Sequence, residues 1–206
     1  LSFNGNLVSK PYLEMTIKIL ETFGVQIERE DNRVVIFPNI FELKNYFVES
    51  DWSSASYFYT HFALNPRVAT LKIFGLKEKS IQGDSIIAKI MELFGVKTKY
   101  FEEYIVLSKN GENIWPEKFE FDFSEYPDLV PTMAVFLSIL GIPSIFYGTQ
   151  ILKHKESDRA WVLKEELSKL GQEIEVNENN MILSGTRNIL RENNDIFIKT
   201  YDDHRI

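Results

Sequence analysis

The chain has 206 residues, of which 44% are hydrophobic, so it is long enough to bury a substantial core. It contains no cysteine, which excludes disulfides, thiolate nucleophiles and cysteine-bound zinc, and its three histidines are too scattered to predict a metal site. The formal net charge of −7 disfavours a nucleic-acid partner, and no signal peptide or membrane-spanning run is visible. These features fit a cytoplasmic protein. The pattern stops abruptly at both ends, from Leu1 to Ile206, so we expect a piece of a longer protein.

Three similar segments recur along the chain, and each one predicts a helix, a glycine and a β-hairpin. Gly24, Gly95 and Gly171 follow the three predicted helices, at spacings of 71 and 76 residues. After the first glycine, the hairpin strands are expected at 25–29 and 33–37. A period this long exceeds that of solenoid repeats, so each copy is expected to be a substantial α/β unit.

Further strands and helices precede the hairpins within each repeat. Strand-like runs lie at 44–48, 119–123 and 196–200, and the helices after them open at Asp51, Asp128 and Asp203. Another strand follows at 69–74 and at 144–147, and second helices open at 82–84 and 155–157. The unit is therefore strand, helix, strand, helix, hairpin. Full copies are expected at 41–109 and 117–184, the tail of a preceding copy at 1–37 and the start of another at 194–206.

This order of elements predicts an α/β fold of repeated βαβαββ units, with parallel pairing across each crossover. The helices carry apolar residues on more than one side, so we expect them inside, with the sheets outside. If the units pack around a pseudo-threefold axis, equivalent helix starts share one face, which would bring Asp51, Asp128 and Asp203 together. Several helix N-termini pointing at one place would make an anion site.

The segment 153–159 places charged residues at one of these helix starts. Lys155 and Arg159 add two positive charges there, and Glu156 lies between them, where an acid would be close to a bound anion. The alternative interpretation is a well-capped helix, with Ser157 as the N-cap and Arg159 solvated. By itself, the segment favours this second interpretation.

Six motifs, in order along almost the whole chain, resemble the 5-enolpyruvylshikimate-3-phosphate synthase family. They are Ser9-Lys10-Pro11-Tyr12, Asp51 to Phe58, Gln82-Gly83-Asp84, Pro127-Asp128 with Pro131-Thr132, Lys155 to Arg159, and Asp203-His204-Arg205. The resemblance implies two domains of three βαβαββ units, an inside-out α/β barrel. Residues 1–48 would be the tail of the first domain, and 49–206 would be most of the second.

The resemblance also implies a reaction, the transfer of the enolpyruvyl group of phosphoenolpyruvate to the 5-hydroxyl of shikimate 3-phosphate. No metal or organic cofactor is implied. The expected partners are these two small molecules, with no membrane or nucleic acid, and the expected state is a monomer. Asp128 would accept the proton of the 5-hydroxyl, and Glu156 would protonate the methylene carbon of phosphoenolpyruvate. These two residue types supply the base and the acid that the reaction needs.

The other implied site residues bind the two anionic substrates. Ser9 and Tyr12 would contact the phosphate of shikimate 3-phosphate, and Lys155 would contact both substrates. Phosphoenolpyruvate would be bound by Arg159 and Arg205, with His204 beside it. Arginine suits this role because its planar guanidinium binds phosphate and carboxylate bidentately.

Several alternatives stay open from the sequence. Asp128 and Ser9 are each plausible helix caps, Asp51 and Asp84 are taken as caps or hinge residues, and Arg205 is close enough to the chain end to be frayed. A UDP-N-acetylglucosamine enolpyruvyl transferase shares the implied fold, and a non-catalytic module that binds anions is a third possibility. We expect no measurable turnover from this chain alone.

Overall fold

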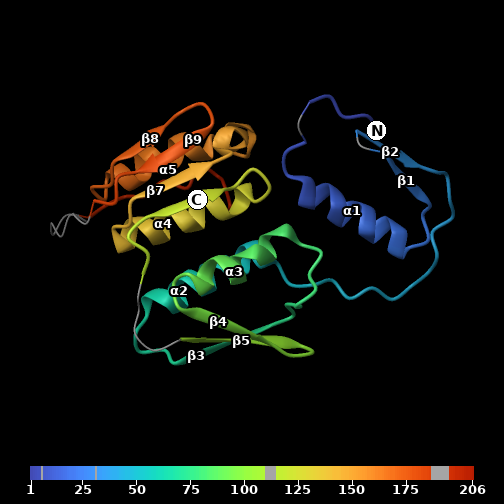
Figure 1. Ribbon diagram of the computed structural model, residues 1–206, viewed down its shortest axis with the longest axis horizontal. Coiled ribbons are helices and arrows are strands. Elements are labelled where there is room, and N and C mark those ends of the chain that lie inside the picture. Colours follow the sequence, from blue (N-terminus) through green and yellow to red (C-terminus); the bar gives the residue numbers. More distant parts are fainter. Residues whose placement is uncertain (6, 31, 110–114, 187–194) are drawn as a thin grey trace.

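The computed structural model of the chain describes residues 1–206 except 6, 31, 110–114 and 187–194 (Figure 1). Its α-helices are α1 (Lys10–Thr22), α2 (Trp52–Leu64), α3 (Ile87–Glu92), α4 (Val130–Leu140) and α5 (Arg159–Ser168). Short 3-10 turns precede three of them: η1 (Gly83–Ile86), η2 (Pro127–Leu129) and η3 (Thr149–His154). Every helix expected before residue 170 is present.

The described strands form three sheets, and of the two full units only the second has the expected parallel pair. The first is the hairpin of β1 (Ile27–Glu30) and β2 (Arg33–Ile36). The second has the order β3 (Thr70–Phe74), β5 (Tyr104–Lys109), β4 (Val96–Tyr100), all antiparallel. The third has the order β6 (Phe119–Asp122), β7 (Ser144–Tyr147), β9 (Asn180–Leu183), β8 (Ile174–Val176). In it β6 and β7 are parallel, with α4 in the crossover between them, as the sequence predicts.

The helices of the two larger units lie inside, between the two larger sheets (Figure 1). Helix α4 is buried on most sides, and Phe94 packs edge-on against its Phe136, with ring centroids 4.9 Å apart. Helix α2 meets α4 directly, since the hydroxyls of Ser56 and Thr132 lie 2.9 Å apart. These two residues are 76 positions apart, close to the repeat length, so equivalent helices of successive units pack on each other. This confirms the prediction of inner helices and outer sheets.

The three repeat glycines have the backbone conformation that their places require. Gly24, Gly95 and Gly171 have φ angles of 84°, 76° and 79°. A residue just beyond a helix often turns left-handed to end it, and glycine adopts that conformation without strain. The three glycines of the sequence repeat therefore mark the ends of three equivalent helices.

Two predicted strands are wrong. Residues 44–48 form no strand because they pack on the end of α1, where Lys44 donates to the carbonyl of Thr22 and Tyr46 stacks near Phe23. Residues 196–200 form none because they are held by side chains of α5, and the amide of Lys199 donates 2.9 Å to Glu166. The helix expected to open at Asp203 is also absent, and this segment forms turns.

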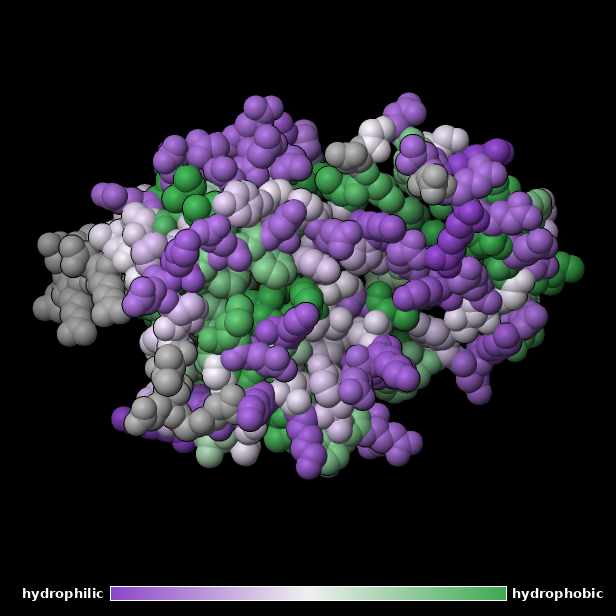
Figure 2. All heavy atoms as spheres, viewed as in Figure 1, coloured by the Kyte–Doolittle hydropathy of each residue, from purple (hydrophilic) through white to green (hydrophobic). Residues whose placement is uncertain are grey.

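Helix α1 and the β1–β2 hairpin stand beside the rest of the molecule rather than within it (Figure 1). Residues 37–50 connect the two parts without regular structure and expose several large apolar side chains, among them Ile40, Leu43 and Val48. In Figure 2, apolar surface shows between charged side chains on the side of the molecule where α1 and residues 37–50 lie. A search of the described residues finds no helix with the length and hydropathy to span a membrane.

Candidate active site

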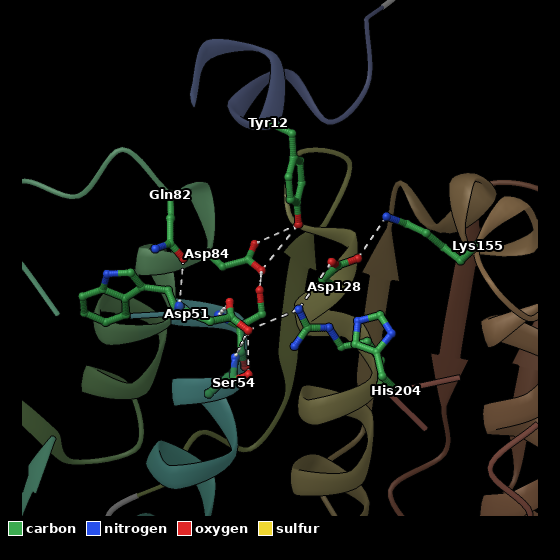
Figure 3. Close-up of polar contacts among 12 residues, drawn as sticks. Tyr12, Asp51, Ser54, Gln82, Asp84, Asp128, Lys155 and His204 are labelled. Carbon is green, nitrogen blue, oxygen red and sulfur yellow. Dashed lines mark hydrogen bonds and ion pairs between the residues drawn. The ribbon is translucent and has the colours of Figure 1, made fainter. Parts of the chain in front are cut away.

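The two helix starts of the unit 117–184 converge, as the sequence predicts. Asp128 lies in η2, and one of its oxygens is 3.0 Å from Nζ of Lys155 and 2.9 Å from a guanidinium nitrogen of Arg159. Lys155 and Arg159 flank the turn into α5, so the two helix starts of the unit 117–184 meet through these charges. In the close-up, Asp128 lies between Lys155 on one side and Asp84 on the other (Figure 3).

Arg159 is the centre of a buried charge cluster. Its side chain is 1% exposed, and it contacts Asp128 at 2.9 Å, Glu156 at 2.6 Å and Asp203 at 2.9 Å. The expectation that Arg159 is solvated is therefore wrong. The cap is also one residue later than expected, because Asp158 accepts from the backbone of Trp161 while Ser157 donates to Asp203.

The cluster keeps its aspartates ionised. Burial works against the charged form of Asp128, but the hydrogen bond and charge of Lys155, with the charge of Arg159, outweigh it and lower the pKa. Burial likewise opposes ionisation of Asp203, and hydrogen bonds from Arg159, Arg205 and Ser157 more than compensate, so its pKa lies well below its usual range. Both groups are therefore carboxylates at neutral pH.

Arg205 joins the three repeat aspartates. Its guanidinium lies 3.5 Å from Asp51 and 3.8 Å from Asp128, and its backbone amide donates 2.9 Å to Asp203. Its side chain is only 9% exposed, so the expectation of a frayed end is wrong. Asp51 also caps α2, accepting from the amides of Ser53 and Ser54, which confirms that prediction.

A cavity of about 300 Å³ opens beside this cluster, between α1 and the starts of α2 and η1. Of the predicted site residues, three line it: Tyr12, Asp128 and Arg205. Glu49, Asp51, Ser53, Gln82, Gly83 and Asp84 also contribute, with Pro11 and Met15 from α1. Lys155, Glu156, Arg159 and His204 do not line it, and neither does Ser9. The predicted meeting of charges is confirmed, but the cavity includes only part of it.

Ser9 shapes the start of α1 through its backbone. It occupies the N-cap position of α1 with a φ of 57°, but its hydroxyl caps no amide. Its own amide donates 3.0 Å to the carbonyl of Ser124, which ties α1 to the second large unit. The strained, left-handed conformation aims the first turn of α1 at the cavity, where Tyr12 enters from above (Figure 3).

Asp84 is the main feature that the sequence interpretation missed. It is 3% exposed and caps no helix; its carboxylate accepts from the hydroxyl of Ser53 and lies 3.4 and 3.5 Å from the hydroxyl of Tyr12. Burial, the largest influence, raises its pKa to about 6. The Gln82-Gly83-Asp84 motif was a signal for it. The interpretation as a cap failed because the partner hydroxyls come from residues distant in sequence.

Glu156, Asp203 and His204 also gather, with possible ligand atoms within 4.8 Å of one another. Both carboxylates already accept from the guanidinium of Arg159, at 2.6 Å and 2.9 Å. A cation would have to displace that arginine, so this group is better described as an ion-pair cluster than as a metal site.

Comparisons with known proteins identify the family. The model of the EPSP synthase (3-phosphoshikimate 1-carboxyvinyltransferase) family matches residues 2–206. A 3-phosphoshikimate 1-carboxyvinyltransferase of Bacteroides fragilis is 38% identical over 207 residues, which cover 100% of this chain and 50% of that protein. The enzyme of the same name from Pyrococcus abyssi is 33% identical over 98% of this chain and 46% of its own length. The chain thus spans about half the length of these relatives.

Solved structures agree on the fold. The EPSP synthase of Acinetobacter baumannii superposes with a TM-score of 0.61 at 20% identity, covering 83% of this chain and 40% of that one. The enolpyruvyl transferase NikO of Streptomyces tendae gives 0.57 at 14% identity, over 86% of this chain and 40% of its own. The fold is that of the enolpyruvyl transferases, and the chain belongs to the EPSP synthase family.

Proposed function

We propose that this chain supplies about half of an active site that transfers the enolpyruvyl group of phosphoenolpyruvate to the 5-hydroxyl of shikimate 3-phosphate, releasing phosphate. The observation that carries the proposal is the contact of Asp128 with both Lys155 and Arg159, at 3.0 and 2.9 Å, in a member of this family. It supplies a candidate base and fixed cations at one place, beside a cavity of suitable size for small anions.

The proposal divides the chain into two parts of different domains. Residues 1–48 would be the tail of a first domain and 49–206 most of a second, with the irregular segment before α2 as the connection. Substrates would lie between the two parts, where Tyr12 of α1 faces Asp84 and Asp128. A monomer in the cytoplasm is part of the same proposal.

Asp128 would accept the proton of the attacking hydroxyl. In the substrate-free arrangement, Lys155 and Arg159 hold its pKa low, which makes it a weak base. Binding of an anionic substrate would draw the Lys155 ammonium toward the substrate and restore basicity to Asp128 at the moment it is needed. Glu156, whose side chain is 49% exposed, would be the acid that protonates the methylene carbon.

Arg205 and Arg159 would have different roles toward the anionic substrates. Arg205 is the better placed to bind one, because it lines the cavity and its buried Nε has no hydrogen-bond partner among the described residues. Arg159 is held by three carboxylates, so it would act chiefly by fixing Asp128 and Glu156 in place. This revises its implied role as a direct ligand of phosphoenolpyruvate.

The test uses the full-length protein that contains this chain, with Asp128→Asn. We expect kcat for phosphate release to fall about 10²–10⁴-fold, the usual loss on removing a general base, while calorimetry shows shikimate 3-phosphate binding within a few-fold of the wild type. Asp122→Asn is the matched control, because Asp122 is exposed on β6 and does not line the cavity. It should leave both quantities unchanged.

Three outcomes would contradict the proposal. Unchanged turnover in Asp128→Asn would remove Asp128 from the chemistry. Turnover with UDP-N-acetylglucosamine but not with shikimate 3-phosphate would assign the related transferase instead, and binding without turnover of either would indicate a non-catalytic module. This chain by itself is expected to show no turnover.

A further inference from the structure

The cavity has a charge balance that does not suit an anion. Four carboxyl groups line it, those of Glu49, Asp51, Asp84 and Asp128, against the single guanidinium of Arg205. Asp51 pairs with Arg205, and Asp128 pairs with Lys155 and Arg159. An anion entering this space must overcome whichever carboxylate lacks a cation.

Among the described residues, Glu49 and Asp84 have no such cation. Glu49 is half-buried and accepts three hydrogen bonds, from the indole of Trp52, the amide of Lys77 and the hydroxyl of Ser80, so the carboxylate in question is Asp84. Within the described ranges of the chain, no lysine, arginine or histidine nitrogen lies within 4.0 Å of it, and its hydrogen bonds come from the neutral hydroxyls of Ser53 and Tyr12. It is nevertheless 3% exposed. A buried carboxylate without a cation is the group most easily neutralised by a proton.

The groups facing Asp84 also favour its protonation. Ser53 of α2 and the charge of Arg205 lower its pKa, but burial, as the largest influence, and the charges of Asp128 and Asp51 raise it to about 6. Tyr12 from α1 and Tyr126 before η2 also face it, and both stay neutral, since burial and the nearby carboxylates raise their pKa values. The proton on Asp84 is therefore exchanged near neutral pH, and a bound anion would hold it more tightly.

The protonation state of Asp84 decides where the hydroxyl of Tyr12 can point. A tyrosine hydroxyl has one proton to donate. An ionised Asp84 only accepts, so it attracts the Tyr12 proton across 3.4–3.5 Å, and Tyr12 then turns its lone pairs to the cavity. A protonated Asp84 donates to the Tyr12 oxygen instead and frees the Tyr12 proton, for which an oxygen of a bound anion then competes with the carboxylate of Asp128.

We propose that Asp84 is a positioning residue of the substrate site, which takes up one proton when a phosphorylated substrate enters and thereby turns the Tyr12 hydroxyl toward it. The proton comes from solvent and is released when the site empties. This inference depends on the proposed function for the identity of the substrate, but not for the direction of the effect, which any phosphate would produce.

The test is the pH dependence of binding in the full-length protein. Calorimetry with shikimate 3-phosphate, from about pH 5 to about pH 8, should show affinity falling as the pH rises past about 6, by up to about tenfold per pH unit. Asp84→Asn should lose this component, because its amide donates to the Tyr12 oxygen at every pH. The phosphate group of the ligand titrates in the same range for both proteins, so the difference between them is the measured quantity.

Two further variants separate positioning from a general charge effect. Ser53→Ala removes a hydrogen bond that stabilises ionised Asp84, so the pH at which affinity falls should move upward. In a Tyr12→Phe background, which has no hydroxyl to turn, Asp84→Asn should change affinity much less than in the wild type. An equal effect in both backgrounds would overturn the positioning role.

Equal pH profiles for the wild type and Asp84→Asn would overturn the proposal entirely. Failure of the wild type to bind shikimate 3-phosphate would count against the proposed function alone. In that case inorganic phosphate serves as the probe for the same comparison, with the same expected and contradicting results.

Discussion

Arg159 combines near-complete burial with three carboxylate partners, and this combination defines its importance. Its hydrogen bonds reach Asp128 in η2, Glu156 in the preceding turn and Asp203 near the chain end. Removing one partner of a buried ion pair leaves the others charged and desolvated, which costs far more than the pair contributes. The residue is therefore structural as much as functional.

We predict that Arg159→Leu destabilises the chain by about 3–5 kcal/mol, because it leaves buried carboxylates without a cation. Urea unfolding followed by circular dichroism measures this difference. Arg29→Leu is the matched control, since Arg29 also contacts two glutamates but at the surface, and it should move the midpoint little.

The same difference should depend on pH. Arg159 lowers the pKa values of Asp128 and Asp203 in the folded state, so the stability that these groups contribute is present at neutral pH. It is lost as the pH falls below their unfolded values of about 4. A stability difference between wild type and Arg159→Leu that persisted undiminished in acid would contradict the electrostatic explanation.

A glycine ends one helix of each repeat, and at Gly95 the effect of its backbone conformation can be measured without any steric clash. Its φ angle is 76°, and an added Cβ would meet nothing within 4 Å. We predict that Gly95→Ala costs about 1–2 kcal/mol from backbone strain alone. Gly95→Asn should cost less, because asparagine tolerates this conformation. Equal urea midpoints for glycine and alanine would contradict this account.

Local patterns predicted most elements, and the failures share one cause. Helices α1 to α5, and the glycines that end α1, α3 and α5, depend on spacing and capping within a few residues, which the sequence displays. The runs at 44–48 and 196–200 look like strands locally, but side chains of α1 and α5 hold them instead. Contacts between distant residues are not visible in a local pattern.

The same limit applies to the site. The motifs predicted that Asp128, Lys155 and Arg159 meet, and they do. They did not predict that Arg159 would be enclosed or that Asp84 would be a buried carboxylate without a cation, because burial depends on which unit packs against which. Residue type and order can be read from a chain, but solvent exposure cannot.

The molecule as a whole consists of a small part formed by α1, β1 and β2 and a larger part with the two big sheets, joined by an irregular segment. That segment exposes Phe41 at 59% and Phe47 at 66%, on backbone outside any sheet or helix. Exposed, irregular chain is where proteases cut first.

We predict that brief chymotrypsin treatment cuts this chain after Phe41, Phe47 or Phe197, which is 80% exposed on irregular backbone, before it cuts elsewhere in the described residues. The remaining larger product, identified by mass spectrometry, should keep α2 to α5 and their two sheets. Early cuts within α2 or α4 would contradict the proposed boundary near residue 48, since those helices form the interior.

Arg205 touches an aspartate from each of three successive copies of the repeat, by side chain or backbone. The three copies are therefore not independent units, because each contributes an aspartate to the same charged centre at Arg205. Deleting or inserting a copy would leave Arg205 with too few or too many negative partners. The charge balance at Arg205 therefore limits how many copies can meet there.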